Sequence, residues 1–204
     1  MQGHRHPNGG GFVADTADVA DTAYVGSYAK VYGNAIVCGN ALVYDNAKVC
    51  GYAKVSGYTK VSSYAEVYGN ALVYDNAKVY SNAHVHGYAQ VYGNAMVFGN
   101  AKVYGNALVY GNAEVYSNAH VHGNAEVSDD AKVYNNAEVH GDAMVYGNAK
   151  VSGNANVSGY VKVYGNVVLT SGVYDSGIID KPVDDGDKPW ERIHVKLSNR
   201  RRKW

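Results

Sequence analysis

The sequence predicts an all-β fold, a parallel β-helix solenoid, and three observations carry that prediction. An aliphatic residue recurs at every sixth position from Val13 to Leu169, and all but the last are valine. The position four residues later is small, and it is alanine from Ala17 to Ala155 with Thr59 as the one exception. A pair such as Gly-Asn or Asp-Asn directly precedes many of these small residues.

The six-residue spacing favours short strands over a helix. A helix of about 3.6 residues per turn would spread such a repeat around its whole surface, whereas a short strand points one side chain inward and its two neighbours outward. Glycine, asparagine and aspartate tolerate the positive φ angles of a sharp corner. Each hexad is therefore predicted to be one strand and one corner, and strands this short bury apolar surface by stacking on copies of themselves.

The same residues resemble the hexapeptide-repeat family, whose aliphatic first position and small fifth position match the valines and alanines of residues 13–174. The resemblance implies a left-handed parallel β-helix with three hexads per turn, an exception to the usual right-handed crossover. The 27 hexads from Val13 to Leu169 would then make about nine turns. The enzymes of the family are chiefly acyltransferases that use coenzyme A thioesters, and the resemblance favours homotrimers.

The repeat divides the chain into three parts. Residues 1–12 form an N-terminal leader, residues 13–174 the β-helix, and residues 175–204 a C-terminal cap with a basic tail. Within the last part, Ile193–Leu197 alternates apolar and polar residues. This alternation predicts a strand that shields the open edge of the last turn.

Composition and charge exclude several classes of partner. The 18 basic and 18 acidic residues balance, so the chain carries no specific signal for nucleic acid. No apolar segment near the start suits a signal peptide, and none is long enough to cross a membrane. Cys38 and Cys50 lie 12 residues apart, hence on different faces, so no internal disulfide is expected. These features predict a cytoplasmic protein.

Residues 18 apart should stack in columns, and one face then collects an apolar strip. Aliphatic side chains return there on every second turn, beside a ladder of tyrosines. Stacked tyrosine also suits β-propensity alone, but contiguous apolar surface usually meets a partner. The candidate oligomer interface comprises Ile36, Leu72, Tyr74, Tyr92, Leu108, Tyr110, Met144 and Tyr146.

Another face is polar and rich in histidine. Its candidate ligand-binding residues are His84, His86, Lys102, Tyr104, His120, His122 and His140, with Glu138 nearby. Such a cluster could bind a metal, an anion or a phosphate, or be a solvated by-product of repeat duplication. His122 and His140 can converge, but His120 and Glu138 should lie roughly 6.6 Å further along the strand. We therefore predict no metal site.

These features favour a non-catalytic homo-oligomeric binding or assembly protein. Faces or inter-subunit grooves rich in tyrosine, asparagine, histidine and lysine would recognise a small polar ligand, for example a nucleotide. We predict no catalytic residue and no cofactor. A hexapeptide-repeat acyltransferase is one alternative, although no hexad carries the inserted loop that usually shapes an acceptor site. A polymer-forming structural scaffold is the other, although the predicted cap argues against unlimited stacking.

Overall fold

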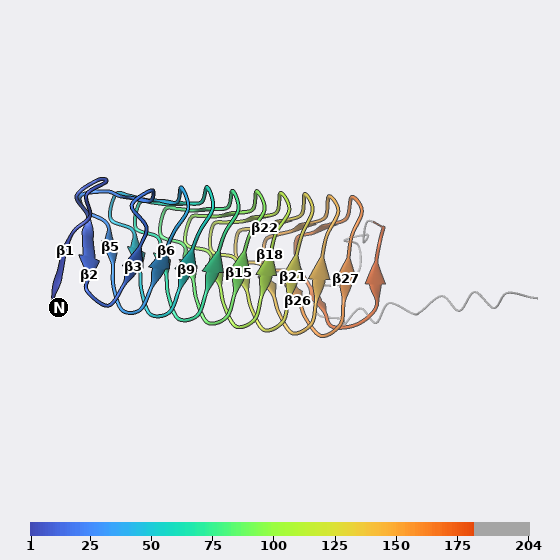
Figure 1. The fold of residues 1–204 in the computed structure, drawn as a ribbon. Coiled ribbons are helices and arrows are strands. Elements are labelled where there is room, and N and C mark those ends of the chain that lie inside the picture. The colour runs from blue at the N-terminus through green and yellow to red at the C-terminus, as the bar shows by residue number, and fades with distance from the viewer. Residues whose placement is uncertain (182–204) are drawn as a thin grey trace, which may run out of the picture.

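The chain folds as one solenoid. The computed structural model describes residues 1–181, and residues 182–204 lie outside the described part. The described residues form 30 β-strands in three sheets and no helix. The chain winds along one axis, so that each turn adds a strand to each sheet (Figure 1). The result is a parallel β-solenoid of about nine turns, which confirms the predicted fold class. The left-handed sense of the coil stays a prediction.

Nearly all the strands are two residues long. The first sheet contains, in order, β1 (Gly3–Arg5), β2 (Phe12–Ala14), β5 (Lys30–Val31), β8 (Lys48–Val49), β11 (Glu66–Val67), β14 (His84–Val85), β17 (Lys102–Val103), β20 (His120–Val121), β23 (Glu138–Val139), β26 (Asn156–Val157) and β29 (Val173–Tyr174). The second contains β3 (Asp18–Val19), β6 (Ile36–Val37), β9 (Lys54–Val55), β12 (Leu72–Val73), β15 (Gln90–Val91), β18 (Leu108–Val109), β21 (Glu126–Val127), β24 (Met144–Val145), β27 (Lys162–Val163) and β30 (Ile178–Ile179). The third contains β4 (Tyr24–Val25), β7 (Leu42–Val43), β10 (Lys60–Val61), β13 (Lys78–Val79), β16 (Met96–Val97), β19 (Glu114–Val115), β22 (Lys132–Val133), β25 (Lys150–Val151) and β28 (Val168–Leu169).

The core is a column of valine and alanine, as the hexad pattern predicts. Val103 and Val121 are register partners 18 residues apart, and both are fully buried, whereas Lys102 beside them is exposed. Backbone hydrogen bonds join successive turns, and the amide of Lys102 donates to the carbonyl of Ala119 at 2.9 Å. Thr59 takes an alanine place in this core and is fully buried, and its hydroxyl has no hydrogen-bond partner.

The corners use positive φ angles, as the Gly-Asn pairs predict. Gly105 has a φ of +71°, and a Cβ there would lie 2.9 Å from the backbone nitrogen of Gly123 in the next turn. The residues that follow these corner positions form hydrogen-bonded ladders. The side-chain amide Nδ2 of Asn82 donates to Oδ1 of Asn100 at 3.2 Å, and Nδ2 of Asn100 donates to Oδ1 of Asn118 at 3.1 Å. The corners therefore add side-chain hydrogen bonds between turns to those of the backbone.

The N-terminal residues cover two of the three sheet edges at that end. β1 pairs antiparallel with β2 at the edge of the first sheet. At the edge of the third sheet, the amide of Val25 donates to the carbonyl of Asn8 at 3.0 Å, and the amide of Gly11 donates to Val25 at 2.8 Å. Residues 3–11 thus satisfy backbone groups that an open edge would leave unpaired.

At the other end the coil continues a little beyond the repeat. β30 pairs in parallel with β27, so described strands reach past residue 174. The strand predicted at residues 193–197 lies outside the described residues. None of the described residues belongs to a helix that could span a membrane. Cys38 and Cys50 are free and lie on the second and first sheets, which agrees with their predicted placement on different faces.

Candidate functional site

The polar face predicted from the histidines is the outer surface of the first sheet. The residues that follow the buried valines there form a continuous ladder of five stacked rings: Tyr68, His86, Tyr104, His122 and His140. Their centroids are 4.6, 5.0, 4.6 and 5.0 Å apart in that order. We call this row the His/Tyr ladder. Its spacing is the strand spacing of the sheet, so the backbone register itself enforces the stacking.

A second column runs beside the ladder, formed by the residues that precede the buried valines. Parallel pairing places Glu66, His84, Lys102, His120 and Glu138 on consecutive turns. The sheet thus brings together all seven predicted ligand-binding residues on one face. Lys102 is exposed and makes no ion pair with any residue in the range 1–181.

One expectation about this face is wrong. The strand geometry was expected to hold Glu138 away from the histidine pair, but Glu138 Oε1 lies 2.8 Å from His122 Nε2. The amide of Asn156 donates to the other carboxylate oxygen at 3.0 Å, and Asn156 Oδ1 lies 3.2 Å from His140 Nε2. Strand spacing describes Cα positions, whereas the glutamate chain is long enough to reach diagonally across to the neighbouring turn.

This network alters the acidity of its members. The hydrogen bond from His122 is the main cause that lowers the pKa of Glu138, and the nearby charges of His140 and His120 act in the same direction, while burial opposes them. Burial is the main cause that lowers the pKa of His86, with added repulsion from His84 and Lys102. Burial also lowers the pKa of His120. The face therefore favours neutral imidazoles at His86 and His120 beside an ionised Glu138.

We expect the protein to lose stability as pH falls from 7.5 to 5.5. The pKa of histidine in the unfolded chain is about 6.5, and folding lowers the pKa of His86. As the pH falls through 6.5, the unfolded state therefore binds the proton before the folded state does, and the free energy of unfolding decreases. The variant His86→Phe should keep the stack, because on the third sheet a phenylalanine, Phe98, stacks in the same way between Tyr80 and Tyr116. This variant should lose less stability on acidification than the wild type. Thermal melts at both pH values measure this.

The control for that comparison is Tyr104→Phe. It removes a hydroxyl from the same ladder without removing a group that titrates in this range, because burial raises the pKa of Tyr104 above its ordinary value of 10. This variant should keep the wild-type pH dependence. An identical acid-induced drop in melting temperature for His86→Phe and the wild type would contradict the attribution of this pH dependence to His86. The carboxylate of Glu138 adds a loss of the same sign only as the pH falls below 4.5, the ordinary pKa of glutamate, and that loss is complete once the pH is below its lowered folded-state pKa.

Among residues 1–181, the metal-ligating side chains of this face approach one another in pairs. No group of three or more histidine, cysteine, aspartate or glutamate side chains in that range converges as ligands for an ion. His122 is hydrogen-bonded to one carboxylate oxygen of Glu138, and the side-chain amide of Asn156 donates to the other. The face can instead present ring faces, imidazole nitrogens and the Lys102 ammonium to a ligand.

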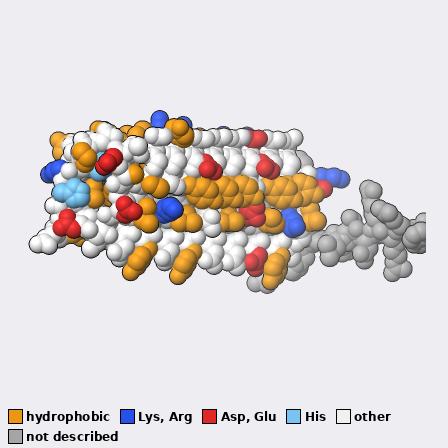
Figure 2. Space-filling model, viewed as in Figure 1, with side chains coloured by type: hydrophobic (Ala, Val, Ile, Leu, Met, Phe, Trp, Pro, Cys, Tyr) orange, Lys and Arg blue, Asp and Glu red, His pale blue; other side chains and the backbone are white. Residues whose placement is uncertain are grey.

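The predicted apolar strip lies on the second sheet. Figure 2 shows hydrophobic side chains gathered in a row that runs across the strands of this sheet, from turn to turn, with single charged side chains beside them. Tyr74, Tyr92 and Tyr110 stack at 4.8 and 4.9 Å, and Tyr146 stacks on Tyr164. Each ring covers its neighbours, so all eight residues of the strip are half-buried and none is fully exposed.

Three features of the surface were missed by sequence reasoning. Tyr68 extends the His/Tyr ladder by one ring, and Glu66 lies 2.8 Å from Lys48 and 3.9 Å from His84. The third sheet carries its own ladder of four aromatic rings, formed by Tyr80, Phe98, Tyr116 and Tyr134. The 18-residue spacing was a sufficient signal for both ladders. A groove at the N-terminal end of the first sheet is the third feature, and it depends on residues outside the repeat.

The stacked two-residue strands and the side-chain ladders along them define the chain as a β-solenoid repeat protein. Two overlapping stretches, residues 89–105 and 101–117, match the family model described as YdcK beta solenoid repeat. These stretches include the strands from β15 to β19 and the central rings of the ladders. No curated protein sequence matches the chain.

Proposed function

We propose that this protein is a non-catalytic, homo-oligomeric binding protein. The first sheet recognises a small polar ligand, for which a nucleotide is the model compound, and the second sheet contacts another copy of the chain. The observation that carries the proposal is the His/Tyr ladder with the exposed, unpaired Lys102 beside its centre. Ring faces spaced by the sheet offer stacking surfaces, and the ammonium group offers a charge-assisted hydrogen bond to an anion.

The apolar strip supports the oligomeric part of the proposal. Leu72, Leu108 and Met144 recur on alternate turns beside stacked tyrosines, and this row extends along several turns of the second sheet (Figure 2). A contiguous apolar strip rimmed by single charges is typical of a surface that meets another protein. A second copy of the chain presents the same strip, so a symmetric contact would bury both.

The test combines ligand binding with solution mass. Titration calorimetry with mononucleotides and sugar phosphates should detect a ligand whose affinity falls about tenfold in the double variant His122→Asn and His140→Asn, because one charge-assisted hydrogen bond contributes about 1.4 kcal/mol or more. Light scattering on the same samples should find more than one chain per particle. Unchanged affinity in the double variant or a monomeric mass would contradict the proposal, as would stoichiometric zinc that the double variant loses.

The same protein samples also test the alternative that the chain is an acyltransferase. The hexads run without insertion through residues 13–169, so a single chain offers no loop-shaped acceptor pocket in that range. Acyl transfer from acetyl-coenzyme A that depends on one of the repeat histidines would replace the binding proposal. The other alternative is a scaffold that polymerises end to end. Residues 3–11 argue against it, because the antiparallel strand β1 covers the edge on which a parallel stack would continue, and they favour a finite oligomer.

A further inference from the structure

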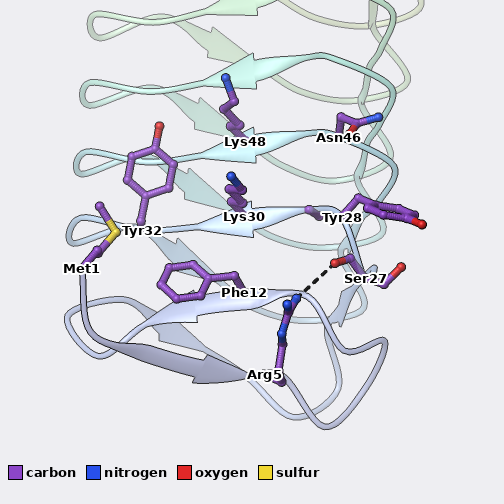
Figure 3. A pocket seen from close by; sticks show the side chains of 10 residues that line it. Met1, Arg5, Phe12, Ser27, Tyr28, Lys30, Tyr32, Asn46 and Lys48 are labelled. Carbon is purple, nitrogen blue, oxygen red and sulfur yellow. Dashed lines mark hydrogen bonds between the residues drawn. The ribbon is translucent and has the colours of Figure 1, made fainter.

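A groove of about 780 Å³ lies at the N-terminal end of the first sheet, apart from the His/Tyr ladder. Figure 3 shows its lining side chains, which come from the N-terminal segment and from the first turns of the solenoid. Its volume is in the range of pockets that hold small molecules, about 300–1,000 Å³. A second, smaller groove continues from it along the same corner and adds Tyr64 and Glu66 to the lining.

Aromatic rings stand on both sides of a lysine column in this groove. Phe12, Lys30 and Lys48 occupy equivalent places on consecutive strands. Figure 3 shows Tyr32 on one side of the two lysines and Tyr28 on the other. Tyr28 is a corner residue with 74% of its surface exposed, so its ring face is available for stacking.

The charges of the groove do not cancel. Its side-chain cations are Arg5, Lys30 and Lys48, and the one carboxylate of the adjoining groove, Glu66, is paired with Lys48 at 2.8 Å. Arg5 donates from Nη1 to the carbonyls of Gly10 and Ser27, at 3.1 and 3.2 Å. Its other guanidinium nitrogens make no hydrogen bond within the described residues. Two side-chain charges, those of Arg5 and Lys30, are therefore left without an acidic partner among the lining residues.

We propose that this groove binds a phosphate monoester that carries a planar ring. The dianionic phosphate complements the two uncompensated cations, Arg5 and Lys30. Lys48 lies one strand spacing from Lys30, about 4.8 Å along the sheet, and its ammonium group is held by Glu66. Arg5 is held in place by two carbonyls and presents its remaining N–H groups from the N-terminal segment. The planar ring stacks on Tyr28. The groove shares no residue with the His/Tyr ladder, so this site is separate from the one proposed above.

Titration calorimetry with AMP as the probe tests this site. Wild-type protein should bind AMP saturably and should bind adenosine and ribose 5-phosphate more weakly, since each lacks one of the two recognised parts. Lys30→Gln should weaken AMP binding about tenfold, because a charge-assisted hydrogen bond contributes about 1.4 kcal/mol or more. Tyr28→Ser should also weaken it. Small polar residues, mostly asparagine, stand at the equivalent corner position of most other hexads, so the coil tolerates a small polar side chain there.

Matched substitutions on other sheets provide the controls. Lys60 precedes a buried valine on the third sheet as Lys30 does on the first, and Tyr58 is a corner tyrosine with 66% exposure. Lys60→Gln and Tyr58→Ser should leave AMP binding unchanged. The proposal is overturned if Lys30→Gln behaves like Lys60→Gln, if adenosine or ribose 5-phosphate binds as tightly as AMP, or if millimolar AMP does not bind. AMP binding that only the His122→Asn and His140→Asn double variant weakens would assign the ligand to the ladder instead of this groove.

Discussion

Val103→Asp should abolish or severely reduce the stability of the solenoid, whereas Lys102→Asp should leave it nearly unchanged. Val103 is fully buried between register partners above and below, and an unpaired carboxylate there costs several kcal/mol. Lys102 is exposed, and surface substitutions usually change stability by less than about 0.5 kcal/mol. Urea unfolding of the two variants measures the difference.

This comparison tests the register of the whole coil. A shift of one residue along the strand would exchange the inward and outward positions of Lys102 and Val103. Equal unfolding midpoints for the two variants would contradict the observed register. Because a small domain is stable by only about 5–15 kcal/mol, the buried carboxylate alone could leave Val103→Asp largely unfolded.

The second large effect is expected at a corner, where Gly105→Val should destabilise the protein far more than Gly105→Asn. Gly105 has a φ of +71°, a conformation that β-branched residues rarely adopt, and strain of this kind costs about 1–3 kcal/mol. Asn135 adopts a φ of 59° at a corner of the same solenoid, so asparagine fits with a small backbone adjustment. Thermal melts of both variants provide the measurement.

The asparagine variant serves as the control for the added Cβ. That atom would lie 2.9 Å from the backbone of Gly123 in either variant, so a steric clash alone would harm both equally. A large loss for valine with a small loss for asparagine assigns the effect to φ. Equal losses would show that the close approach between turns, and not the backbone conformation, requires glycine here.

The fold could be predicted because every strand repeats one local rule. The valine spacing identified which side chains point inward, and the 18-residue columns predicted the stacking of His122 on His140 and of Tyr74 on Tyr92. Both follow from periodicity, since in a solenoid the contacts of one turn are copied in the next. Tyr68 obeys the same spacing but was not among the candidate residues, because tyrosine follows the buried valine on all three sheets and so does not by itself mark this face.

The sequence by itself determined the β-solenoid, its inward residues, its corners and the members of each column, because these depend on the spacing of residues along one chain. Only the tertiary structure decided how side chains reach between columns and turns. Glu138 contacts His122 because a flexible side chain spans a distance that strand spacing does not describe. The groove around Lys30 exists because β1 folds back on β2 and brings Arg5 to Ser27, a contact between segments that no repeat relates.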